Sequence, residues 1–188
     1  MIYQYLSLIS DLGTKLICTA VAAIVEGGPS SIHHGAVEAF HPEELPGSII
    51  TKRNISSWYE HLDRPSWRPP KWAFGPVWTV LYAGMGYASY LVYKQGGGTM
   101  ALVLYSTQLL LNWTWTPIFF GQHNLKLASY EISALWLAVA ACGVKFFSIN
   151  KVAGMLFIPY LAWVSLATAL TFDVWRRNGD RPEPVKTE

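Results

Sequence analysis

The sequence predicts an all-α membrane protein, a bundle of five transmembrane helices. The 188-residue chain is 52% hydrophobic and 14% charged, whereas soluble domains carry about 25% charged residues. Beyond residue 57, apolar residues form four runs, each near the ~20 residues that cross a hydrocarbon core. These runs lack the period-two alternation of a transmembrane β-barrel, so helices are the remaining way to span a membrane.

The first predicted span covers about residues 2–25. It contains Asp11 and Lys15, each of which costs about 2.5–3.5 kcal/mol at the centre of a membrane helix. Because the two residues are four apart, they can pair on one helix face. A cleaved signal peptide is the alternative, since Leu16–Val25 is a short apolar core. Against cleavage, no Lys or Arg precedes Lys15.

A polar loop is predicted for residues 26–57, and together with the first span it forms a divergent N-terminal region, 1–57. Three prolines, four glutamates and a Gly-Gly pair interrupt the apolar pattern. Side chains with spacings that a metal ion could use are His33, His34, Glu38 and His41. No cysteine or helical pattern supports a metal site there, so we expect solvated loop residues and no metal or cofactor.

A proline- and tryptophan-rich segment, Pro65–Trp78, precedes the second span. Proline lacks an N–H and fixes φ, and the residue before each proline is pushed toward extended geometry. Pro65–Pro70 is therefore predicted to be stiff and extended, and the four prolines argue against a helix interior here. Its aromatic and cationic side chains are typical of a segment at a membrane surface.

The four clearer spans follow one another with short connections. They are predicted at about residues 75–93, 100–120, 127–147 and 152–175. The core of the protein is then 58–177, and 178–188 is a polar C-terminal tail.

Lysine and arginine are distributed unevenly across this topology. The side that holds the first loop, the third loop and the C-terminus carries ten of them, and the other side carries three. The positive-inside rule therefore puts the C-terminus in the cytosol. A net charge of +2 without a basic stripe argues against nucleic acid as a partner. No Ser-His-Asp set or phosphate-binding glycine loop is present, so no covalent catalytic residue is predicted.

Polar and small residues within the spans are candidates for function or for packing. Asn112, Gln108 and Glu131 are polar positions at membrane depth, where such residues usually face the bundle interior. Asn112 and Gln108 are four apart, so they either tie helices together or contact a ligand. Gly84 and Ala88 form a small-xxx-small pair, a pattern that permits close helix contact or a homodimer.

Tryptophans within the spans are the sharper candidates for a binding site. Flat aromatic walls suit a flat, apolar ligand such as a porphyrin, whereas tryptophans at span ends fit an interfacial belt. Trp163 lies mid-span, which favours a pocket. The candidates are Trp78, Trp113, Trp115 and Trp163.

An ordered set of aromatic, proline and polar positions runs through the core. It comprises Trp58, Tyr59, Leu62, Pro65, Trp67, Pro69, Pro70, Pro76 and Trp78, then Leu81-Tyr82, Met85–Tyr87, Asn112-Trp113, Trp115, Pro117–Gly121, Pro159–Trp163 and Trp175-Arg176. This pattern resembles the translocator protein family, also called tryptophan-rich sensory proteins or peripheral benzodiazepine receptors. The resemblance covers residues 58–177 and is not clear over 1–57.

The resemblance implies a multi-pass membrane receptor or transporter in contact with membrane lipid. Its implied ligands are porphyrins such as protoporphyrin and sterols such as cholesterol. In eukaryotes its implied location is the mitochondrial outer membrane. Two alternatives remain: a light-dependent porphyrin-degrading enzyme that uses Trp78 and Trp163, and a ligand-modulated scaffold or sensor. The implied pocket lies between the first, second, fourth and fifth helices, under the first loop. Matching pocket positions are Phe74, Gly75, Val77, Trp78, Trp163, Ala167 and Leu170.

Three positions depart from the family pattern. Leu127 replaces a tryptophan, Thr171 stands where vertebrate members have asparagine, and Thr116 replaces a proline. The first two changes alter the pocket wall, which bears on selectivity for synthetic drugs.

The implied sterol motif at the end of the fifth helix also departs from the family. Its matching positions are Leu170, Phe172 and Arg176, with Phe172 in place of a tyrosine and Asp173 next to it. Phenylalanine lacks the hydroxyl that would bond a sterol 3-OH, and Asp173 is placed to pair with Arg176 or Arg177. We therefore expect weaker sterol binding than in members with the full motif.

Overall fold

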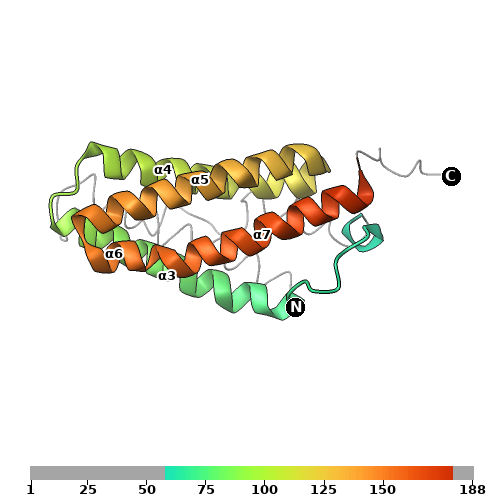
Figure 1. Ribbon diagram of the computed structural model, residues 1–188, viewed down its shortest axis with the longest axis horizontal. Coiled ribbons are helices and arrows are strands. Elements are labelled where there is room, and N and C mark those ends of the chain that lie inside the picture. The colour runs from blue at the N-terminus through green and yellow to red at the C-terminus, as the bar shows by residue number, and fades with distance from the viewer. Residues whose placement is uncertain (1–57, 180–188) are drawn as a thin grey trace, which may run out of the picture.

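The computed structural model describes residues 58–179, and this part of the chain is helical without a β-strand. Its elements are η1 (Tyr59–His61), α3 (Lys71–Lys94), α4 (Thr99–Thr116), η2 (Pro117–Gly121), α5 (Leu125–Ile149), α6 (Lys151–Met155) and α7 (Phe157–Asn178). Figure 1 shows the long helices side by side in an elongated bundle, with α4 and α5 along one edge and α3 along the other. The predicted all-α class is confirmed for these residues, and the predicted first span, 2–25, lies outside them.

Two of the four spans predicted after residue 57 are long and apolar enough to cross a membrane. They are Leu125–Ile149 and the stretch Lys151–Asn178, which contains α6 and α7. In that stretch a turn at Leu156 separates the two helices. Pro159 lies in the first turn of α7, where its missing N–H costs no intrahelical hydrogen bond.

The sequence predicted that Pro65–Pro70 is extended throughout, and the structure differs from this prediction. The Arg68 amide donates to the Pro65 carbonyl at 3.4 Å, which closes a turn. Helix α3 begins directly after Pro70 and includes Pro76, so the expectation that these prolines exclude a helix interior is wrong at Pro76. Pro76 falls in the second helical turn, where its ring removes one backbone hydrogen bond.

Asparagine caps and one glycine fix the turns of the bundle. The Asn124 side chain accepts from the Leu127 amide at 2.9 Å, and Asn150 accepts from the Ala153 amide at 3.0 Å, so each begins a helix. Gly154 of α6 packs directly on Phe147 of α5, leaving no room for a Cβ. The buried core between the helices includes Met85, Tyr105, Val139, Phe146 and Tyr160.

Candidate ligand pocket between α3 and α7

One face of α7 carries three of the seven predicted pocket residues. Trp163, Ala167 and Leu170 are half-buried. Their spacing of four and three residues puts them on one stripe of the helix, and the same stripe continues through Val174 to Asn178, which are buried. We name these five residues the pocket stripe, and its first residue, Trp163, contacts Phe74 of α3.

Helix α3 supplies the opposing aromatic rings. Phe74 meets Trp163 edge to face, with ring centroids 5.4 Å apart. Trp78, four residues further along α3, contacts Tyr160 edge to face at 6.3 Å and stacks on Tyr82 at 5.4 Å. The structure thus brings Phe74 and Trp163 into direct contact and sets Trp78 one helical turn deeper.

The two remaining predicted residues of α3 have smaller roles in the geometry. Gly75 is buried, and its carbonyl accepts from the Thr79 hydroxyl at 3.1 Å. Val77 is half-buried and packs on the hydrophobic core. Both lie between Phe74 and Trp78 and contribute shape rather than polar contacts.

A buried hydrogen-bond chain lies next to Trp78. The Tyr82 hydroxyl donates to Asn112 Oδ1 at 2.6 Å, Asn112 Nδ2 donates to the Tyr160 hydroxyl at 3.0 Å, and Tyr160 donates to Gln108 Oε1 at 3.0 Å. Because these bonds join α3, α4 and α7, they favour the helix-tying role of Asn112 and Gln108 over ligand contact. Sequence reasoning missed Tyr82 and Tyr160 as parts of this site, although both stand within four residues of a candidate tryptophan.

The indole N–H of Trp163 is a polar atom that the rest of the described chain leaves unused. Trp163 Nε1 is buried and has no hydrogen-bond partner among the described residues. A matched contrast is Trp136 of α5, whose Nε1 donates to the Ser165 hydroxyl at 2.7 Å. Since buried donors are usually bonded, the Trp163 N–H is a candidate donor to a ligand or to a residue outside 58–179.

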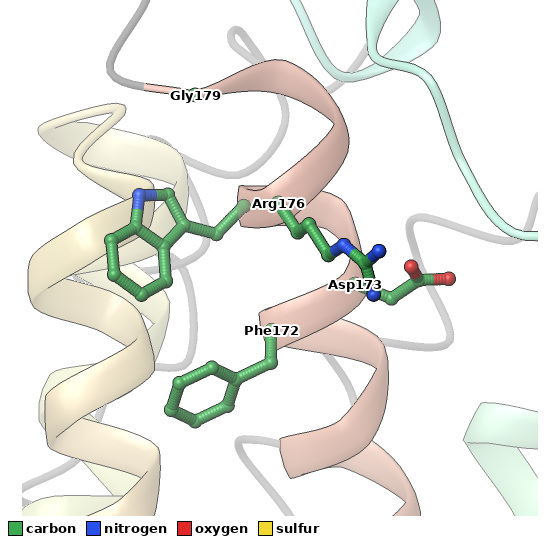
Figure 2. A pocket seen from close by; sticks show the side chains of 5 residues that line it. Phe172, Asp173, Arg176 and Gly179 are labelled. Carbon is green, nitrogen blue, oxygen red and sulfur yellow. The ribbon is translucent and has the colours of Figure 1, made fainter.

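Two of the three sterol-motif residues, Phe172 and Arg176, lie at one hollow of the surface. This hollow is open, with a volume of about 670 Å³ near the end of α7, and Figure 2 shows Arg176 extending away from the Phe172 ring. Leu170 belongs to the pocket stripe, about 200° around the helix from Phe172. The Asp173 carboxylate forms an ion pair with Arg177 at 3.1 Å. Of the two partners expected for Asp173, Arg176 and Arg177, the structure shows the second.

The structure also shows the surroundings of Glu131 and of the Gly84–Ala88 pair. Glu131 accepts a hydrogen bond from Thr114 of α4 at 3.1 Å, so it ties α5 to α4. Ala88 is fully buried within the protomer, whereas a Cβ on Gly84 would meet no atom within 4 Å. The Gly84–Ala88 pair is therefore split between surface and core, which weakens it as a dimer face.

Potential metal ligands do not gather in the described part of the chain. Residues 58–179 contain no group of three or more His, Cys, Asp or Glu side chains placed to hold a metal ion. The histidine-rich set at 33–41 lies outside the described residues.

Similarity to known proteins identifies the family. The model of the TspO/MBR family matches residues 44–176. The chain belongs to the TspO/MBR family. It is 45% identical over 126 residues to the translocator protein of Homo sapiens, an alignment that covers 64% of this chain and 75% of the human protein. It is 43% identical over 126 residues to the tryptophan-rich sensory protein of Cereibacter sphaeroides, with 67% and 80% covered.

A third relative extends the alignment. The translocator protein of Sus scrofa is 38% identical over 144 residues, covering 72% of this chain and 85% of the relative. The relatives include proteins of animals and of bacteria, and residues 58–179 of this chain contain two helices long and apolar enough to cross a membrane. This TspO/MBR protein is therefore a membrane protein.

Proposed function

We propose that this TspO/MBR protein is a five-helix membrane protein that binds porphyrins and cholesterol-like sterols and moves them within the membrane. The porphyrin site lies between α3 and the pocket stripe of α7. The first helix of the bundle is the predicted span 2–25.

The observation that carries the porphyrin assignment is the environment of Trp163. Its ring meets Phe74 at 5.4 Å, and its buried N–H has no partner among the described residues. A porphyrin supplies a flat apolar ring for stacking, worth about 0.5–1.5 kcal/mol per ring pair, and carboxylates that accept hydrogen bonds. No other tryptophan of the predicted pocket combines these two properties, since Trp78 is stacked on Tyr82.

The proposal is tested by titrating the purified protein with protoporphyrin in darkness and following the porphyrin absorption band. Trp163→Ala removes both the stacking surface and the donor, so we expect the affinity to fall about tenfold or more. Trp136→Ala is the matched control, because it removes an indole that is already bonded to Ser165, away from the pocket stripe. Equal loss of affinity in both variants would reject the pocket assignment.

A light-dependent porphyrin-degrading enzyme is the second candidate. Trp78 contacts the rings of Tyr82 and Tyr160, and tryptophan and tyrosine are the side chains that most readily give an electron to a photoexcited dye. An enzyme consumes protoporphyrin under illumination in air, with turnover lost in Trp78→Phe. Porphyrin that stays intact through hours of light in the presence of protein rejects this candidate.

Two further measurements distinguish transport from sensing and determine the location of the protein in the cell. Exchange of porphyrin between protein-containing and empty vesicles is expected to be faster than exchange between two protein-free populations. A ligand-modulated scaffold or sensor binds porphyrin without such acceleration. The mitochondrial outer membrane is the proposed location in a eukaryotic cell, and cell fractionation checks it.

A further inference from the structure

The outward face of α3 carries a line of exposed side chains. The buried face of this helix includes Leu81, Met85 and Val92, and at 3.6 residues per turn the exposed line falls on the opposite side of the helix. Its members are three and four residues apart, which puts them on one stripe. The outer stripe, as we name it, consists of Val80, Ala83, Tyr87, Tyr90 and Lys94, all exposed.

Three residues of the outer stripe contact one another. The Tyr87 and Tyr90 rings stack with centroids 6.4 Å apart, and Lys94 Nζ lies 5.7 Å from the centroid of the Tyr90 ring. A cation is attracted to the face of an aromatic ring, so the Lys94 ammonium is directed back along the stripe. Within residues 58–179 neither the two hydroxyl groups nor the ammonium forms a hydrogen bond or an ion pair. The stripe therefore offers one cation and two hydroxyl groups to a ligand.

The end of the bundle that holds Lys94 is basic. Figure 1 shows the α3–α4 connection and the turn between α5 and α6 at this same end, and the lysines there are Lys94, Lys145 and Lys151. The acidic residues of the described chain belong to the opposite half of the bundle, in η1 and the segment after it, near the start of α5 and near the end of α7: Glu60, Asp63, Glu131 and Asp173. An anionic group at the Lys94 end thus meets three lysines and no carboxylate of residues 58–179.

The length of the outer stripe fits one leaflet of a bilayer. Val80 and Lys94 are 14 positions apart, which is about 21 Å along the helix. Half of the hydrocarbon core and one headgroup region together measure about 20–22 Å. Tyr90 then lies about 6 Å nearer the bilayer centre than Lys94, at the level of the glycerol esters, whose carbonyl groups accept hydrogen bonds.

We propose that the outer stripe binds one anionic phospholipid of the leaflet at the α3–α4 end of the bundle. The lipid phosphate pairs with the Lys94 ammonium, and an ester carbonyl accepts from the Tyr90 hydroxyl. An acyl chain lies along Tyr87, Ala83 and Val80. A lysine beside an anionic headgroup raises its occupancy about fivefold, so the site prefers an anionic lipid to a zwitterionic one by about this factor.

The proposal is tested by photolabelling the full-length protein in phosphatidylcholine nanodiscs. Phosphatidylglycerol and phosphatidylcholine that carry the same diazirine on an acyl chain are added to separate samples at the same low mole fraction. Adducts are located by mass spectrometry. We expect about fivefold more adducts on residues 80–94 with phosphatidylglycerol. Equal labelling by the two lipids shows an ordinary lipid-facing surface and overturns the proposal.

Variants assign the preference to named side chains. Lys94→Gln is expected to bring the labelling ratio of the two lipids close to one. Lys151→Gln is the matched control, because it removes one positive charge from the same end, at the first residue of α6, and it is expected to keep most of the preference. Equal losses in both variants show that the total charge of this end attracts the lipid and overturn a site at Lys94.

The Tyr90 ring is tested separately. Tyr90→Leu removes the ring beneath the ammonium and the hydroxyl, and it is expected to lower the labelling ratio at least twofold. Tyr93→Leu is the control, because Tyr93 is an exposed tyrosine of the same helix outside the outer stripe. A full preference in Tyr90→Leu, with the protein folded by circular dichroism, contradicts the proposed contact.

Two other occupants of the outer stripe are distinguished in the same samples. Excess glycerol 3-phosphate is expected to leave the lipid adducts unchanged relative to chloride at the same ionic strength, and displacement shows a site for a soluble phosphate instead. A photoreactive p-benzoylphenylalanine in place of Tyr87 is expected to cross-link to lipid. Cross-links to residues 2–25 show that the predicted first span covers the stripe, and either of these results overturns the proposal.

Discussion

Loss of the Asn112 side chain is expected to destabilise the bundle strongly. Asn112 accepts from Tyr82 at 2.6 Å and donates to Tyr160 at 3.0 Å, and these residues belong to three different helices. In Asn112→Leu both hydrogen bonds are lost and the buried Tyr82 hydroxyl has no acceptor. Interhelical hydrogen bonds in membranes average about 0.6 kcal/mol each, and an orphaned buried hydroxyl costs about 1–3 kcal/mol, which gives about 2–4 kcal/mol in total.

A double-mutant cycle separates the hydrogen bonds from mere loss of packing. Tyr82→Phe removes the hydroxyl that Asn112→Leu leaves without a partner, so the double variant is expected to be more stable than the sum of the single losses by about 1 kcal/mol. Unfolding is followed in detergent by near-ultraviolet circular dichroism. Thr107→Val serves as the control, because that exposed hydroxyl bonds only within α4. Losses that add within about 0.5 kcal/mol refute the buried hydrogen-bond chain as a linked unit.

Three further predictions concern the sterol motif, the orientation in the membrane, for which the test residue Asn54 lies outside the described residues, and the packing of α6. Phe172→Tyr combined with Asp173→Tyr is expected to increase labelling by a photoactivatable cholesterol analogue, and equal labelling of the unmodified protein contradicts a sterol site at the α7 hollow. Asn54, in the sequon Asn-Ile-Ser, is expected to stay without a glycan in cells, and a glycan there reverses the predicted orientation. Gly154→Ala is expected to cost about 1–3 kcal/mol of unfolding free energy because its Cβ collides with α5, whereas Gly86→Ala, which points into open space, is expected to be neutral or slightly stabilising.

The helical segments could be predicted from the sequence because their signal is local. Long apolar runs with few charged residues define α3, α4 and α5 within a few residues. The breaks were missed where a proline changes the backbone hydrogen bonding. Pro117 begins the π-helical turn η2, and Pro159 lies in the first turn of α7, which begins at Phe157 after a break at Leu156. Neither proline interrupts the apolar composition from which a span is predicted.

The candidate site was only partly predictable, because its contacts join residues far apart in the chain. Trp163 was selected for its mid-span position, and both Trp163 and Trp78 were selected for their match to the family. Tyr82 and Tyr160 look like ordinary interior aromatics until the helices are packed together. Asn178 gave no signal at all, since the backbone amide that donates to its side chain belongs to Asp63, 115 residues away, and any residue type at position 63 except proline supplies that group.

The central claim is that porphyrin binds between α3 and the pocket stripe of α7, and direct mapping of a bound ligand tests it. A protoporphyrin derivative that carries a diazirine is bound to the protein in lipid nanodiscs, activated, and located by mass spectrometry. We expect saturable adducts on the segments Phe74–Trp78 and Trp163–Leu170, which excess protoporphyrin prevents. Adducts that cluster instead on Phe172–Gly179, or that do not saturate, would contradict the account.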